Sequence, residues 1–172
     1  MIAAIGISRA VNFWQPIGMG ANHIESRLHR HLVDSLYVEA MVLADEARSY
    51  FDEGGRAERE ALDPMTRVGF SCESLKVTTR LMHVIAWLLT QRAVDNGEMP
   101  PGEALDPSRR LGPPPESDLA LIDRLPLQAR AIVDTSIDLF RRTARLDDVM
   151  AREGVVAPSP VLTMLERLAY SI

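Results

Sequence analysis

The chain has 172 residues, of which 47% are hydrophobic, and this is enough for one domain that buries a core without disulfides. The net charge of −5 disfavours non-specific binding to nucleic acid, because phosphate neutralisation needs a basic surface. No apolar run reaches the roughly 18–20 residues of a membrane span, and the single cysteine, Cys72, indicates a reducing compartment. We therefore expect a cytoplasmic protein in which Cys72 is a small core residue.

Residues 1–21 lack the basic start, apolar centre and cleavage site of a secretory signal. We expect them to be a flexible leader, or the product of a mis-assigned start where the true start is Met19. The first long helix is expected to begin near Asn22 or Ser26, which are favourable capping residues, and to end at Gly54 and Gly55.

The apolar residues of this first helix form one broad stripe that predicts a buried face. Its members are Leu28, Leu32, Val33, Leu36, Tyr37, Ala40, Leu43, Ala44, Ala47, Tyr50 and Phe51. Val38, Met41 and Val42 point away from the stripe. They are either scattered surface residues, which are common, or part of a possible dimer face.

A second long helix is predicted over residues 64–96, because Asp63 can cap it, Pro64 suits its first turn and Gly97 suits its end. A charged segment before it, residues 55–62, predicts one helical turn. Two adjacent apolar stripes, both expected to be buried, contain Leu75, Met82, Ile85 and Leu89, and Phe70, Val77, Leu81, Val84 and Leu88. A helix that is apolar over so wide an arc is expected at the centre of a bundle.

The second helix also carries one tryptophan on its opposite, polar side. His83 and Gln91 lie one turn from Trp87, and Arg80 and Val94 lie two turns from it. Such a tryptophan either contacts another part of the fold or binds a partner, since Trp near Arg is enriched at interface hot spots. Arg80, His83, Trp87, Gln91 and Val94 are therefore the candidate protein-binding residues.

Residues 98–116 form a proline-rich linker that is either disordered or used for binding. It contains Pro100, Pro101, Pro107, Pro113, Pro114 and Pro115. A third helix is predicted from Ser117, with a break at Pro126, to about Arg152. Its expected buried stripe is Ile132, Val133, Ser136, Leu139, Phe140, Thr143, Leu146 and Met150. The domain assignment is therefore a three-helix bundle over residues 22–153, followed by a tail, residues 154–172, with a short amphipathic helix.

The residue types that carry catalysis are present but are not arranged for it. His29 and His31 are two positions apart and so diverge on a helix. Adjacent carboxylates such as Asp147 and Asp148 also diverge and resemble solvated helix surface. Glycine-rich phosphate loops, nucleophile elbows and paired Glu-x-x-His motifs are lacking. We therefore predict a protein that is not an enzyme and has no cofactor and no metal.

Residues 73–99, ESLKVTTRLMHVIAWLLTQRAVDNGEM, together with LYVEAMVLADEARSYFD in the first helix, resemble the alphaproteobacterial regulator of CtrA degradation family. The short motifs Thr78–Met82 and Trp87–Val94 are fairly specific to this family when both occur in one chain. Much of this family is described only as a domain of unknown function. The resemblance covers residues 30–100 well, the third helix more loosely, and the leader and linker hardly at all.

The resemblance implies an all-α, antiparallel three-helix bundle, to which the residues of this chain add a short C-terminal helix. The family has a flexible tail, so this helix puts tail-dependent delivery of cargo in doubt. The resemblance also implies a homodimer that acts as an adaptor, delivering cell-cycle regulators to the ClpXP protease with a response-regulator-like partner. Its partners would be the protease, its regulators or its substrates. The competing interpretation is a ligand- or nucleic-acid-binding transcriptional or cell-cycle regulator without catalytic activity. Nucleic acid is disfavoured by the charge, and a membrane by the absence of a span.

Overall fold

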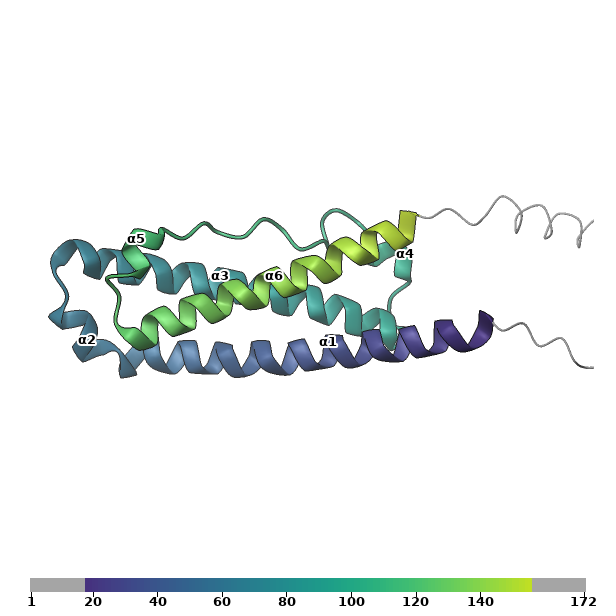
Figure 1. The fold of residues 1–172 in the computed structure, drawn as a ribbon, viewed down its shortest axis with the longest axis horizontal. Coiled ribbons are helices and arrows are strands. Elements are labelled where there is room, and N and C mark those ends of the chain that lie inside the picture. Colours follow the sequence, from purple (N-terminus) through teal and green to yellow (C-terminus); the bar gives the residue numbers. More distant parts are fainter. Residues whose placement is uncertain (1–17, 156–172) are drawn as a thin grey trace, which may run out of the picture.

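The computed structural model describes residues 18–155, and the regular elements of that range are all helices (Figure 1). Three long helices run the length of the molecule: α1 (Gly18–Ser49), α3 (Pro64–Asp95) and α6 (Leu127–Val155). Shorter elements join them: a π-helical turn (Tyr50–Gly54), α2 (Arg56–Ala61), α4 (Pro101–Ala104) and α5 (Leu119–Ile122). The predicted all-α bundle is confirmed. The predicted tail helix and most of the predicted leader lie outside the described residues.

The ends of α3 follow from local chemistry. The Asp63 carboxylate accepts hydrogen bonds from the backbone N–H groups of Met65 and Thr66, each at 3.1 Å, and so caps the first turn that Pro64 opens. Gly97 follows the helix with a φ of 73°, a conformation that favours glycine. The predicted range of this helix is confirmed, whereas α1 begins at Gly18, earlier than the capping residues indicated.

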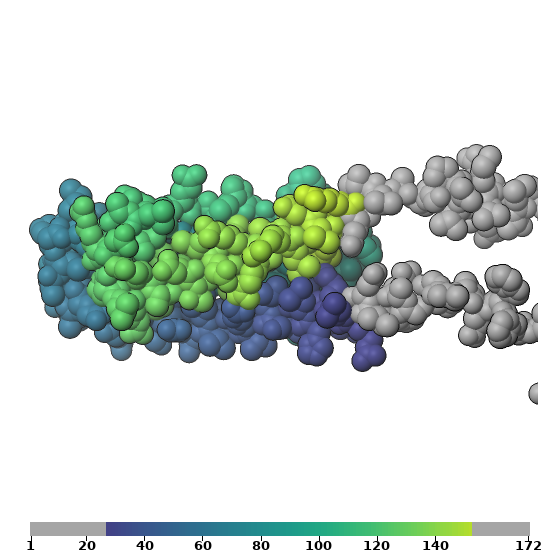
Figure 2. Space-filling view, viewed as in Figure 1, coloured from purple at the N-terminus to yellow at the C-terminus, as the bar shows by residue number. Residues whose placement is uncertain are grey.

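The connection between α3 and α6 returns along the whole bundle before α6 begins, so α6 runs parallel to α3 and antiparallel to α1 (Figure 1). We call residues 98–118 of this connection the strap. Two side-chain hydrogen bonds show that α3 and α6 run in the same direction. Arg80 donates to Ser136, and Trp87, which comes later in α3, donates to Asp147, which comes later in α6. In Figure 2 the side chains of α6 and of the strap cover most of α3.

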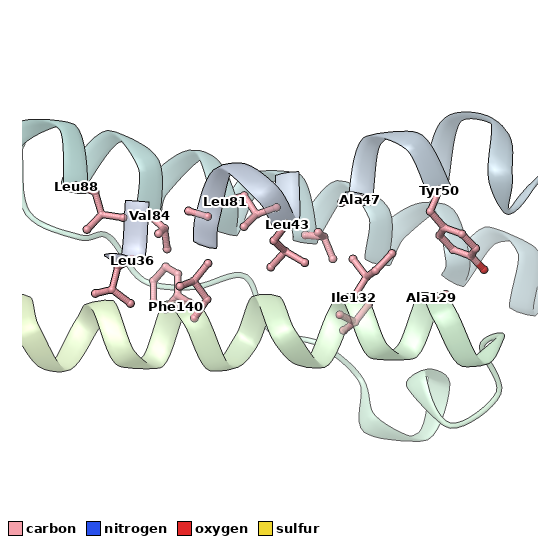
Figure 3. Packing of buried hydrophobic residues seen from close by; sticks show 14 of the residues in the cluster. Leu36, Leu43, Ala47, Tyr50, Leu81, Val84, Leu88, Ala129, Ile132 and Phe140 are labelled. Carbon is pink, nitrogen blue, oxygen red and sulfur yellow. The ribbon is translucent and has the colours of Figure 1, made fainter. Parts of the chain in front are cut away.

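The core is a continuous apolar cluster between the three long helices (Figure 3). It joins Leu36 and Leu43 of α1, Val84 of α3, and Ile132 and Phe140 of α6, all of which are buried. The stripe predicted for the third helix is confirmed at its first six positions, which are buried, and its last two members are partly buried. Removal of this apolar surface from water is the main source of stability.

The predicted orientation of α3 is wrong on one side. Leu75, Met82 and Leu89 belong to a stripe expected in the core, yet they are 68%, 64% and 47% exposed. The stripe that contains Val77 and Leu81 is buried as predicted. The remaining buried side of α3 is the polar one, because α6 and the strap both pack there. Three further predicted core residues of α1 and α3, Leu28, Leu32 and Cys72, are also exposed.

The N-terminal part of α3 approaches α5 so closely that a larger residue at position 69 would have to displace the Leu121 side chain. A Cβ atom added to Gly69 would lie 2.4 Å from one methyl group of Leu121 and 2.7 Å from the other. We expect Gly69→Ala to lower the free energy of unfolding by about 1–3 kcal/mol, the usual cost of overpacking, measured by urea denaturation. Leu121→Ala in the same chain should recover most of this loss. If the losses in unfolding free energy of the two single substitutions simply add in the double variant, the side chain at position 69 does not clash with Leu121.

Candidate protein-binding surfaces

The side of α3 that was predicted to bind a partner is occupied within the subunit. Trp87, Arg80 and Gln91 are only 2%, 1% and 3% exposed, so the prediction that they lie on an open polar side is wrong. His83 and Val94 are partly exposed. The physical reason is that the strap returns over this side of the helix, which brings polar partners to residues that face solvent in an isolated α3.

One end of this buried polar strip is organised around a carboxylate of α6. The Asp147 Oδ1 atom accepts a hydrogen bond from the Trp87 indole N–H at 2.8 Å and another from Nε of Arg110 in the strap at 2.6 Å. Arg110 also lies 3.6 Å from Asp148, and its hydrogen bond to Asp147 raises its pKa. Asp147 was predicted to be solvated helix surface, but it is 5% exposed, so that prediction is wrong.

The other end is organised around two buried charged residues of α3, Arg80 and Glu73, which share Ser117 as a hydrogen-bond partner. Arg80 donates hydrogen bonds to Ser136 of α6 at 3.2 Å, to the backbone oxygen of Pro115 at 3.0 Å, and to the Ser117 hydroxyl. Ser117 donates in turn to the fully buried Glu73 carboxylate at 2.5 Å. Burial lowers the pKa of Arg80, and the charge of Glu73 opposes that effect.

The Glu73 carboxylate has a further partner, the Lys76 ammonium, at 2.8 Å. The buried polar groups of this end are therefore paired through charge-assisted hydrogen bonds, as buried charges require. The cluster was not predicted, because Ser117 is far from Glu73 and Arg80 in the sequence. The spacing of seven residues that puts Glu73 and Arg80 on one side of α3 is the only sequence signal, and it fits a solvated surface equally well.

The surface that remains open is apolar and lies across α1 and α3, away from α6. We call it the α1/α3 face, and its members are Val38, Met41, Val42, Leu75, Met82 and Leu89, each between 44% and 68% exposed. Contacts of one arginine join the two helices here. Nε of Arg92 in α3 lies 3.2 Å from the Asp34 carboxylate of α1, and the Arg92 guanidinium lies 4.5 Å from the centre of the Tyr37 ring. Leu75 and Met82 also line a groove between the two helices, so these exposed apolar residues are not all isolated on the surface.

A groove of about 530 Å³ lies between α1 and α3 beside this face. Leu81 and Ile85 of α3 and Phe51 line it, and Arg48, Asp52 and Arg59 are among its polar residues. Arg48 and Asp52 are 3.8 Å apart, so charges of both signs surround the apolar centre. The exposure predicted for Val38, Met41 and Val42 is confirmed. The sequence analysis did not predict that α3 contributes to this open surface, because it placed the stripe of Leu75, Met82 and Leu89 in the core.

Among the described residues there is neither a candidate metal site nor a candidate membrane span. Residues 18–155 contain no group of three or more His, Cys, Asp or Glu side chains arranged to hold a metal ion. None of the described helices combines the length and the hydropathy that a membrane span needs. On α6, Arg142 is paired with Glu39 of α1 and with Asp138, so this arginine joins two helices.

Comparisons with known proteins agree with the fold. Residues 24–172 match the family described as "Protein of unknown function (DUF1465)". The structure is similar to the crystal structure of RcdA from Caulobacter crescentus CB15, with a TM-score of 0.57 and 34% sequence identity over 69% of this chain and 90% of that chain. No curated protein matches the sequence. The resemblance to the regulator of CtrA degradation family is confirmed.

Proposed function

Because this chain belongs to the DUF1465 family of proteins of unknown function, we propose its function from its similarity to RcdA and from its open surface. The chain is a non-enzymatic, protein-binding regulator of proteolysis. It acts as an adaptor that brings cell-cycle regulators to the ClpXP protease. The observation that supports this most is the identity of 34% with RcdA over 90% of that chain, which spans the bundle rather than a local motif.

The adaptor proposal has a direct biochemical test. Purified ClpXP degrades a purified cell-cycle regulator such as CtrA, and the rate is followed with and without this protein and its response-regulator-like partner. We expect the protein to raise the degradation rate without being consumed, because an adaptor raises the local concentration of its cargo. An unchanged rate, together with no detectable binding to the protease or the cargo, would refute the proposal.

The α1/α3 face is the surface that we assign to self-association, with a second copy of the chain as its occupant. A centre of aliphatic and methionine side chains, with charged groups of both signs around it, is the composition of a homodimer interface. A twofold axis on this face would bring each copy's exposed Leu75 and Met82 onto the same apolar patch of the other. The dimer would leave α6 and the strap of both copies open.

We expect Met82→Glu to convert the dimer into a monomer, because two carboxylates would be buried in a symmetric interface. Met82 is 64% exposed in the subunit, so the free energy of unfolding of the monomer should change by no more than about 0.5 kcal/mol. The measurement is mass by light scattering during size exclusion. Thr135→Glu, at an exposed position of α6, is the matched control and should remain dimeric. A monomeric wild-type protein at all concentrations would refute this assignment.

A further inference from the structure

The strap is attached to the bundle mainly through polar contacts. Ala104 is the only buried residue among residues 98–118, and the others are exposed or partly exposed. Two sets of polar contacts hold the rest, Arg110 against Asp147, and Pro115 with Ser117 against Arg80 and Glu73. The one apolar contact beside them is Leu111, which packs partly buried against the core cluster. A segment that buries so little apolar surface is stabilised less than the helices beneath it and opens more readily.

Two buried polar atoms on this side of α3 have no hydrogen-bond partner among the described residues, and one of them, on His83, lies beside the strap. They are the Oε1 atom of Gln91, a residue that is 3% exposed, and the Nδ1 atom of His83. A cavity of about 410 Å³ lies between α3 and the strap, lined by His83, Trp87, Thr90 and Arg110 among others. Buried polar groups are normally paired, so the strap is an incomplete match to the surface that it covers.

We propose that the groove between α3 and α6 is a second binding site, for an extended peptide segment, and that the strap occupies it as an internal competitor. The residues that sequence composition marked as a binding surface are the floor of this groove, namely Arg80, Trp87 and Gln91. All three are buried, Arg80 by Ser136 of α6 and by Pro115 and Ser117 of the strap, and Trp87 by the core cluster and by Asp147 of α6, with the strap beside it. The site is distinct from the α1/α3 face, so this inference does not depend on the proposed dimer.

The contacts of the strap define the chemistry of the ligand. Asp147 selects an arginine, because a charge-assisted hydrogen bond to a carboxylate of low exposure is costly to leave unmade. At the other end, Arg80 selects a backbone carbonyl group and a hydroxyl, which donates onward to Glu73. Arg110 and Ser117 are seven positions apart. The ligand is therefore an extended segment with an arginine and, about seven residues later, a serine or threonine.

The three prolines at positions 113–115 explain how the strap keeps this shape. Proline fixes its backbone in an extended, polyproline-like conformation and removes a hydrogen-bond donor. An extended segment that is already ordered loses less entropy when it binds. A competing partner segment is expected to be extended and proline-containing for the same reason.

The proposal is tested with the strap supplied as a separate molecule. In a full-length variant, residues 107–117 are replaced by glycine and serine at equal length, and a fluorescent peptide of residues 105–120 is added. Anisotropy should show binding to this variant and binding at least about tenfold weaker to the wild-type chain, whose own strap competes. The peptide with Arg110→Ala should bind about tenfold more weakly, and the matched Arg109→Ala peptide should bind within about twofold of the original. A folded variant that does not bind the peptide would overturn the proposal.

If circular dichroism shows that the glycine–serine variant does not fold, a point variant of the natural chain decides the question. In Asp147→Asn the strap loses its charge-assisted anchor, so hydrogen exchange of the amides of residues 107–117 should accelerate about tenfold. Amides of α1 and α6 should keep their rates. Asp134→Asn, at an exposed position of α6, is the matched control. Equal exchange of the strap in both variants would overturn the proposal.

Discussion

Substitution of Trp87 by alanine is expected to lower the free energy of unfolding by about 3–5 kcal/mol, the usual cost of removing a buried aromatic side chain. The indole is 2% exposed and packs within the core cluster of the bundle. Alanine would leave a cavity and would remove the N–H donor of the Asp147 carboxylate. For a chain of this size the midpoint of thermal unfolding should fall by roughly 10 °C.

Trp87→Phe separates the two contributions of the indole. Phenylalanine keeps most of the apolar volume and removes the hydrogen bond at 2.8 Å to Asp147, so its cost should be about 1–2 kcal/mol. Both variants are measured by thermal and urea denaturation, followed by circular dichroism so that the loss of the tryptophan does not affect the signal. A Trp87→Ala protein as stable as the wild type would show that the indole is not part of the core.

Arg80→Met is expected to have a comparable effect, a loss of about 3–5 kcal/mol. Methionine restores much of the apolar volume of Arg80 but leaves the fully buried Glu73 carboxylate with Lys76 and Ser117 as its remaining partners. It also removes the donor to the backbone oxygen of Pro115, which holds the strap. Denaturation in urea measures the loss, and hydrogen exchange should show the strap opening first.

A double-mutant cycle tests whether the buried charge is the cause. Glu73→Gln in the Arg80→Met background removes the uncompensated charge, so the two substitutions together should cost clearly less than the sum of their separate effects. Arg145→Met, at an exposed position of α6, is the control and should change stability by no more than about 0.5 kcal/mol. Additive effects of Arg80→Met and Glu73→Gln would show that the two side chains act independently.

Local chemistry accounts for the parts of the fold that were predicted correctly. The Asp63 cap, the glycine after α3 and the break at Pro126 each act within a few residues, so these particular helix ends could be read from the sequence. The stripe of α6 was also predicted because that helix has one apolar side and one charged side. A helix of this kind has a single orientation that buries its apolar residues.

The orientation of α3 was not predictable in the same way, because its apolar residues cover two sides and its polar residues cover a third. Which two sides are buried depends on the path of the strap, and that path is fixed by contacts between residues distant in the sequence, such as Arg110 with Asp147. Hydrophobic periodicity therefore placed Leu75 inside and Trp87 outside, when the structure has the opposite. The same error hid the α3 half of the open apolar face.

The returning path of the strap also decides what the two ends of the chain can reach. Because α6 runs parallel to α3, the first described residues of α1 and the last of α6 lie at one pole of the bundle (Figure 1). The α1–α2 corner occupies the opposite pole. Fluorophores attached at residues 18 and 155 would therefore lie at the same pole and would leave that corner accessible.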